Sequence, residues 1–182
     1  MRQFSDDVIQ LDRGRLRPIR EADLGDLTAA CNDEALREWL PIPIPYTLDD
    51  AREFAVDYAT RQLASGKGIE RAIESGGRLS GVIGLKNTDW AVGSTEAGYW
   101  LAPWGRGKGL MTTALMAMTD WSFRQGLQRV EVHVATRNLP SLAVALRSGF
   151  QIEGTRRQAA RTHGGLVDVL SLSRLASDPP LW

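Results

Sequence analysis

The segment EAGYWLAPWGRGKGLM, residues 96–111, joins a predicted strand to a predicted helix through a loop that holds three glycines. Aromatic and apolar side chains fill residues 96–101, which is typical of a strand, and Pro103 marks its end. From Leu110 to Phe123 the apolar residues recur at helical spacing, and Gly126 stops that helix. The segment therefore predicts a strand–loop–helix unit in a fold that contains both sheet and helices.

The loop of this unit is expected to bind an anion. Gly107 and Gly109 let backbone N–H groups turn toward one point, and the N-terminus of the following helix adds partial positive charge. Arg106 and Lys108 add full charges near the same point. This density of glycine suits a pyrophosphate better than a lone carboxylate.

Two common nucleotide-binding loops do not fit the segment. A Walker loop needs Gly-Lys-Ser/Thr, whereas Gly109 follows Lys108. A dinucleotide fingerprint needs a third glycine and an acidic residue at the end of the next strand, and neither is present. The alternative to an anion site is a turn whose glycines serve geometry alone, because such short motifs are weak signals.

The same kinds of signal predict further elements on both sides of this unit. Pro18 indicates that residues 16–19 form an edge strand, because proline cannot donate inside a central ladder. Asp23 is expected to cap one helix, and Thr47 to open another that runs through Leu63. Further strands are expected at 70–74, 79–85, 130–134, 150–153 and 167–172, and short helices at 36–40 and 142–146. This order predicts an α+β fold with mixed strand pairing.

The composition is that of an ordinary soluble protein. The 182 residues fit a single domain over residues 1–182, with a core at about 12–175 and short tails, the second of which ends at Trp182. Lys and Arg number 22, as do Asp and Glu, so no net field favours nucleic acid or an anionic membrane. We therefore expect no direct nucleic-acid partner.

Cysteine and histidine are too few and too scattered for a disulfide or a structural metal site. Cys31 is the only cysteine, and His133 and His163 lie far from it in sequence. The first ten residues lack the apolar core of a signal peptide, and no run approaches the roughly 18 apolar residues of a membrane helix. We expect a cytoplasmic protein without a membrane partner or a metal.

Several motifs together resemble the GNAT acetyltransferases. The loop from Arg106 to Met111 resembles the Arg/Gln-x-x-Gly-x-Gly/Ala coenzyme A loop of that superfamily, and residues 96–101 resemble the fourth strand of its Rim-type branch, which acetylates ribosomal-protein N-termini. The same branch is resembled at residues 16–24, 138–141 (Asn-x-x-Ser) and 149–154 (Gly-Phe-x-x-Glu-Gly). The resemblance covers about residues 12–175.

The resemblance implies a GNAT fold, which is a twisted, mostly antiparallel mixed sheet of six to seven strands with helices on both faces. It also implies an enzyme that moves an acetyl group from acetyl-CoA to a primary amine, by direct attack in a ternary complex. The first-choice acceptor is a protein or peptide N-terminal α-amine. Alternatives are a small amine (polyamine, amino acid or aminoglycoside), another acyl-CoA donor, and a non-catalytic acyl-CoA-binding sensor. A homodimer is compatible with the resemblance.

Site residues follow from the same resemblance. Glu96 matches a glutamate that many relatives use as the base, directly or through water, and a solvated strand end is the alternative. Ser141 matches a serine that can hydrogen-bond the coenzyme sulfur, and a helix N-cap is its alternative. Asn138 would orient the pantetheine, and an ordinary turn asparagine is its alternative. The coenzyme-binding residues that the resemblance implies are Trp100, Leu101, Ala102, Arg106, Gly107, Lys108, Gly109, Leu110, Met111, Thr112, Asn138 and Ser141.

Two positions depart from the family pattern. Met111 replaces the small last residue of the loop, and Ala145 stands where many members carry a tyrosine acid. The usual route for protonating the thiolate is therefore absent, which supports the sensor alternative, whereas Glu96 and Ser141 oppose it. His133 shares a strand face with Glu131, and we interpret it as a polar residue on the less buried face rather than as a base. Family geometry places residues 39–46 beside the acceptor pocket.

Overall fold

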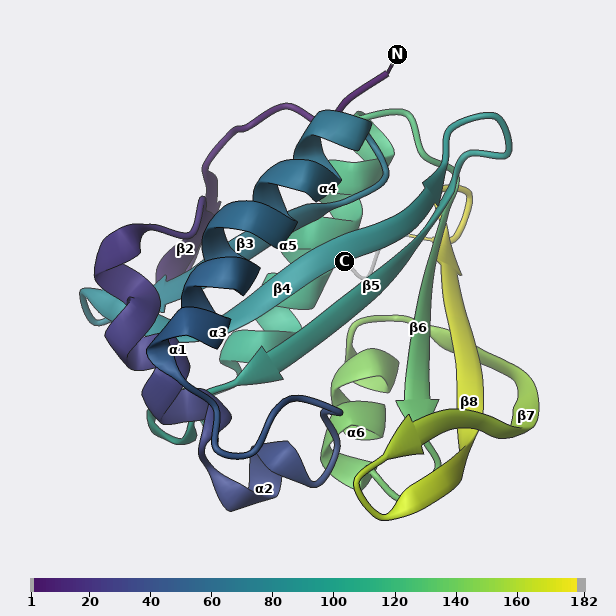
Figure 1. Cartoon of the computed structure of the whole chain (residues 1–182). Coiled ribbons are helices and arrows are strands. Elements are labelled where there is room, and N and C mark those ends of the chain that lie inside the picture. Colours follow the sequence, from purple (N-terminus) through teal and green to yellow (C-terminus); the bar gives the residue numbers. More distant parts are fainter. Residues whose placement is uncertain (1, 180–182) are drawn as a thin grey trace.

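One eight-stranded sheet organises the residues that the computed structural model describes, 2–179 (Figure 1). The strand order is β1-β2-β3-β4-β5-β6-β8-β7, and every neighbouring pair is antiparallel except β5 with β6. The strands are β1 (Ile9–Leu11), β2 (Gly14–Arg17), β3 (Ile69–Ser75), β4 (Arg78–Asp89), β5 (Ser94–Leu101), β6 (Arg129–Ala135), β7 (Gln151–Thr162) and β8 (Gly165–Leu175). The predicted mixed sheet is confirmed, with one strand more than the six to seven expected. The predicted end of the second tail at Trp182 lies outside the described residues.

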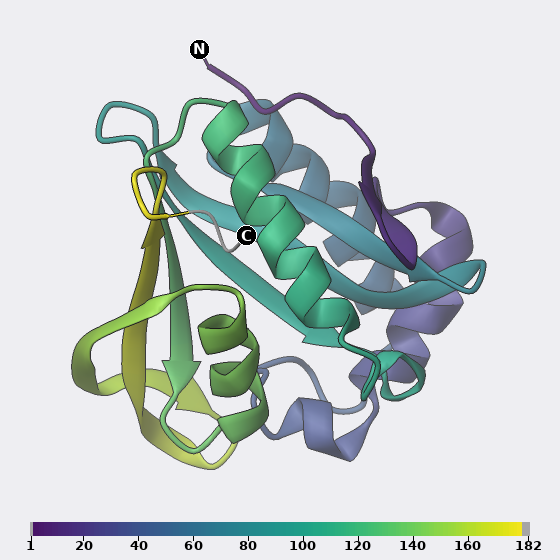
Figure 2. The same ribbon diagram turned by 180° about the vertical axis from the view of Figure 1, so that it is seen from behind.

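Helices cover both faces of the sheet, as predicted. The segments from α1 to α4 lie on one face (Figure 1), and α5 and α6 lie on the other (Figure 2). No helix within residues 2–179 is long and apolar enough to cross a membrane. The helices are α1 (Leu24–Cys31), α2 (Glu34–Arg37), α3 (Leu48–Arg52), α4 (Ala59–Ser65), α5 (Leu110–Arg124) and α6 (Leu139–Arg147), with the π-helical segment η2 (Glu53–Tyr58) joining α3 to α4.

Each face of the sheet has its own apolar core. Under α5, Met111, Leu115 and Met118 are buried against the strands, which confirms their spacing as core packing. Strand alternation divides β5 as predicted, because Tyr99 packs on this core whereas Trp100 packs on the core under α1 and α3. The face that carries Trp100 therefore also carries Glu96 and Gly98 of β5.

Three expectations at the N-terminal end were wrong. β2 is not an edge strand, because β1 pairs with it on its outer side, and Pro18 follows its last residue. With only three residues, β1 is too short to show a period in the sequence. The second helix spans Glu34–Arg37 rather than 36–40, because Asp33 caps it by accepting the Leu36 N–H at 3.1 Å. Asp23 does not cap α1 through its side chain.

The Asp23 carboxylate instead accepts a bidentate pair of hydrogen bonds from Arg17 at 2.7 and 2.8 Å. Both side chains are almost fully buried, and Glu74 is a second partner of the same guanidinium. Burial alone would raise the pKa of Asp23, but the hydrogen bonds from Arg17 and from the Arg20 N–H outweigh it and lower that pKa. The Arg17–Asp23 pair therefore holds the residue before α1 against the end of β2.

Arg17→Met should lower the free energy of unfolding by about 3–5 kcal/mol, because it leaves the Asp23 carboxylate buried without a counter-charge. Since the folded state lowers the pKa of Asp23, the pair's contribution is present above the ordinary carboxyl pKa and is lost as the pH falls below about 4. Urea unfolding should show that the free energy of unfolding of the parent falls as the pH drops below about 4, and that it falls less in the variant.

The control is Arg52→Met, which removes the exposed pair with Glu21 and should cost no more than about 1 kcal/mol. Equal losses in the two variants would contradict a special role for the buried pair.

Candidate active site

The parallel pairing of β5 with β6 is short. It joins Ser94–Ala97 to Arg129–Val132 and stops there, while β5 continues to Leu101 on the β4 side and β6 continues to Ala135 on the β8 side (Figure 1). In an antiparallel ladder, alternate residues turn their N–H and C=O groups away from the partner. Part of the backbone between Gly98 and Leu101 therefore faces an opening rather than another strand.

The predicted coenzyme residues of this strand do not all keep free backbone groups. Trp100 and Leu101 both pair with β4, and alternation from the Ala102–Ser80 bond turns both backbone groups of Trp100 toward β4, so only those of Leu101 face the opening. The Ala102 N–H donates to the Ser80 carbonyl at 3.0 Å. The Leu101 carbonyl accepts from Arg106 Nε at 3.3 Å.

The glycine loop follows at the end of β5. Gly107 and Gly109 have φ of +74° and +73°, and a Cβ added at either would meet no atom within 4 Å. Their outer sides are therefore open to an approaching ligand. Gly109 immediately precedes α5, so the N–H groups of Leu110, Met111 and Thr112 lie in the helix's first turn, where they have no partner within the helix. The Met111 side chain is buried in the core, which explains why bulk is accepted there.

The charged residues of the loop are held by neighbours. Arg106 Nη2 lies 2.5 Å from Asp33 Oδ1, which links the loop to α2. Lys108 Nζ donates to the Trp104 carbonyl at 2.9 Å. Trp104 is itself fixed, because its indole N–H donates to the Leu79 carbonyl at 2.9 Å. The loop is therefore anchored at both ends while its glycines stay uncovered.

The first turn of α6 lies across the opening from β5. Asn138 is its N-cap, with Oδ1 accepting the Ser141 N–H at 3.1 Å, so the alternative that made Ser141 the cap was wrong. The Ser141 hydroxyl donates to the Tyr99 hydroxyl at 3.2 Å, and that hydroxyl donates to the Ser141 carbonyl at 3.2 Å. Burial raises the pKa of Tyr99 to about 12. Ala145 is fully buried in the core and offers no polar group.

Sequence reasoning missed Tyr99 as a site residue. Alternation places it on the face of α6, but 42 residues separate it from Ser141, and no local pattern shows that the two hydroxyls meet.

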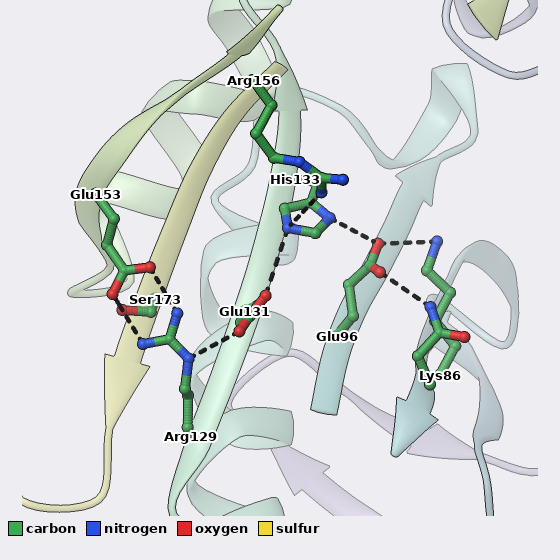
Figure 3. A network of polar contacts seen from close by, with 9 residues as sticks. Lys86, Glu96, Arg129, Glu131, His133, Glu153, Arg156 and Ser173 are labelled. Atoms are coloured by element: carbon green, nitrogen blue, oxygen red, sulfur yellow. Dashed lines mark hydrogen bonds and ion pairs between the residues drawn. The ribbon is translucent and has the colours of Figure 1, made fainter. Parts of the chain in front are cut away.

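Glu96 lies at the base of the opening, among polar partners (Figure 3). Its Oε1 lies 3.0 Å from Lys86 Nζ and 3.5 Å from His133 Nδ1, and its Oε2 accepts from Asn87 Nδ2 at 3.2 Å. Asn87 has φ of +54° at a shift in the β4–β5 register, which turns its side chain toward Glu96. The Glu96 side chain is only 17% exposed, so the alternative of a solvated strand end does not hold.

A chain of polar contacts continues from His133 across β6 (Figure 3). His133 lies on the less buried face, as predicted, with Nε2 3.4 Å from Glu131. Arg129 contacts Glu131 at 2.8 Å and also donates two hydrogen bonds to Glu153, at 2.8 and 2.6 Å. Hydrogen bonds from Arg129 and Ser173 lower the pKa of Glu153 to about 2. The glutamate of the Gly-Phe-x-x-Glu-Gly motif thus ties β7 to β6 and β8.

The tip of the β7–β8 hairpin meets the segment that follows α2. His163 Nε2 lies 3.0 Å from the Ile42 carbonyl oxygen. A groove of about 690 Å³ opens beside this contact. Of the predicted acceptor border at 39–46, only Ile44 lines the groove; the other lining residues are Asp33, Glu34, Ala35, Arg37, Glu38 and His163.

Comparisons with known proteins agree with this geometry. Residues 13–151 match the family model described as an acetyltransferase (GNAT) domain. The chain is 34% identical over 146 residues to the "Putative ribosomal N-acetyltransferase YdaF" of Bacillus subtilis, covering 79% of this chain and 80% of that protein. It is 33% identical over 98 residues to the ribosomal-protein-serine acetyltransferase of Escherichia coli, covering 53% and 55%.

A solved structure of Mycobacterium smegmatis RimJ in complex with CoA-disulfide superposes with a TM-score of 0.90 at 25% identity, covering 99% of this chain and 92% of that one. The resemblance to the Rim-type branch is therefore confirmed by sequence and by fold. With the family model matching most of its length, this chain belongs to the GNAT family and is an N-acetyltransferase.

Proposed function

We propose that this acetyltransferase transfers the acetyl group of acetyl-CoA to the N-terminal α-amine of a protein or peptide. The observation that carries the proposal is the opening between β5 and β6, with the glycine loop at its outer end and Glu96 at its base. The relatives point to the same acceptor, since two of them are named for ribosomal proteins, one specifically for serine.

The residues present fit coenzyme A. The uncovered glycines and the first N–H groups of α5 would hold its pyrophosphate, because neither glycine has a neighbour that blocks close approach. The outward backbone groups of Leu101 and of Tyr99, two residues earlier, would bind the pantetheine amides as a neighbouring strand does. The side-chain oxygen of Asn138 already accepts the Ser141 N–H at the start of α6, so its side-chain amide nitrogen is the group that could bind the pantetheine.

The remaining groups divide the chemistry of direct amine attack. Glu96 takes a proton from the acceptor ammonium, directly or through water, and the neutral amine then attacks the thioester carbonyl. An N–H of β5 faces the developing oxyanion, a contact whose loss typically costs about 100–1,000-fold in rate. The Ser141 hydroxyl, which donates to Tyr99 in this structure, would turn its proton to the departing thiolate and so take the place of the tyrosine missing at Ala145. The second proton, which the attacking nitrogen loses as the amide forms, leaves the coenzyme as the free thiol.

Gly107→Val should weaken acetyl-CoA binding at least about tenfold. Valine is strained at a φ of +74°, so the loop must change shape, and the added branches obstruct the approach of the pyrophosphate. The dissociation constant is measured by calorimetry. The matched control is Gly77→Val, which imposes the same strain at φ +79° in the exposed β3–β4 turn and should leave binding unchanged. Unchanged affinity in Gly107→Val would remove the pyrophosphate from this loop.

Glu96→Gln should lower turnover most at acidic pH and least above about pH 8. An α-amine has a pKa of about 7.7–8.0, so its own ionisation supplies the neutral form at high pH without help from a base. The dissociation constant of acetyl-CoA should barely change. Profiles of kcat between pH 6 and 9 test the role. A variant that follows the parent profile throughout would make Glu96 a structural residue.

Among peptides, the enzyme should prefer an α-amine to a lysine side chain. Neutralising lysine, with a pKa of about 10.4, at pH 7 costs about 4.6 kcal/mol, whereas an α-amine costs only about 1.4 kcal/mol. The test offers a Ser-initiated peptide that contains one lysine, with its N-terminus free and then blocked. Acetylation of the free form alone is expected. Equal acetylation of both forms would favour lysine, and inactivity toward both together with activity toward spermidine would favour a small amine.

A further inference from the structure

A second carboxyl group lies on the sheet face that carries Glu96. Glu70 of β3 is in register with Gly84 of β4, and Gly84 is in register with Gly98 of β5. The Glu70 carboxyl group lies directly over Gly84, because a Cβ built there would fall 2.2 Å from Oε2 and 2.6 Å from Oε1. The side chain is therefore aimed along the row of glycines, toward β5.

This row ends where β5 and β6 separate. Ala97 forms the last pair with β6, so Gly98 is the first residue of β5 beyond that pairing. A Cβ at Gly98 would meet only Lys86 Cε, at 4.0 Å, so the space above Gly98 is open. Neighbouring strands lie about 4.8 Å apart, which leaves about 5 Å between the Glu70 carboxyl group over Gly84 and Gly98. That gap accommodates one ammonium group.

Glu70 differs from the other carboxylates on this face in having no partner. Glu96 is held by Lys86, Glu131 by Arg129, and Glu74 by Arg17. Within residues 2–179, no hydrogen bond or ion pair reaches the Glu70 carboxyl group, and the residue is half-buried rather than buried. Burial raises the pKa of Glu70 to about 8, against a smaller lowering by Lys86. A half-buried carboxyl group without a partner attracts a cation more strongly than a fully solvated one does.

A third titratable group, Tyr58, belongs to the helical layer on this side of the sheet. Burial raises the pKa of Tyr58 in η2, and the charges of Glu70 and Glu96 act in the same direction. Tyr58 therefore lies within electrostatic reach of both carboxyl groups. The two glycines form the floor of this space, and the Glu70 and Lys86 side chains lie beside it.

We propose that Glu70 binds the ammonium group of the acceptor over the Gly84–Gly98 floor, and so selects primary-amine cations and orients them toward the thioester. This inference rests on the proposed function. Glu70 supplies a charge-assisted hydrogen bond, and Glu96, held by Lys86, takes one ammonium proton, so that the nitrogen lone pair is freed for attack. Glu70 is thus a binding residue, and Glu96 is the proton acceptor.

Steady-state kinetics with a Ser-initiated peptide and with n-butylamine separate the two roles. Glu70→Gln should raise KM for both amines about tenfold or more, with kcat changed by less than about threefold, because the negative charge opposite the ammonium is lost although an acceptor oxygen remains. Glu96→Gln should instead lower kcat. The control Glu53→Gln makes the same charge change at an exposed position of η2, on the same side of the sheet, and should match the parent.

Calorimetry with coenzyme A present supplies the second readout. The free-amine peptide should bind Glu70→Gln about tenfold more weakly than the parent, whereas the Nα-acetyl form of that peptide should bind both proteins equally. Because the exchange replaces a partnerless carboxyl group with an amide of the same shape, urea unfolding should show no loss of stability.

An unchanged KM in Glu70→Gln, or equal weakening of the free and acetylated peptides, would overturn the role of Glu70 while leaving the proposed function standing. If the parent acetylates neither amine, the proposed function fails and the assignment of Glu70 falls with it.

Discussion

The site depends on how soon the pairing of β5 with β6 ends, because the two strands run parallel for four residue pairs and then separate. Unpaired backbone groups inside a sheet are costly unless another partner satisfies them. The two strands can separate because each keeps its outer neighbour, β4 for β5 and β8 for β6. The sheet therefore stays continuous at one end and opens at the other, where both α5 and α6 begin.

The polar residues around this opening have different tasks. The polar contacts that run from His133 through Arg129 and Glu153 to Ser173 join β6, β7 and β8, so they hold that side in place. On the β5 side, Lys86 and Asn87 fix the direction of Glu96. Arg106 connects the glycine loop to α2, whose residues line the groove near His163. The glycine loop and this groove are thus linked by side chains and not only by the sheet.

Local patterns in the sequence predicted most strands, the long α5 helix, the two faces of β5 and the glycine loop before α5. They failed where the deciding contact is distant in sequence or the element is very short. β1 has only three residues, and Asp23 pairs with Arg17 instead of capping α1. The meetings of Tyr99 with Ser141 and of Glu96 with His133 depend on register and on the end of a strand pair, which no period reveals.

The contact between Tyr99 and Ser141 spans the opening from β5 to α6 with two hydrogen bonds. It therefore holds the first turn of α6 at a fixed distance from β5 before any ligand arrives. A flexible pantetheine-like chain that binds between them loses its own conformational freedom, whereas the protein there has little conformational freedom left to lose. The entropic penalty of binding falls mainly on the ligand, and the walls are preorganised for it.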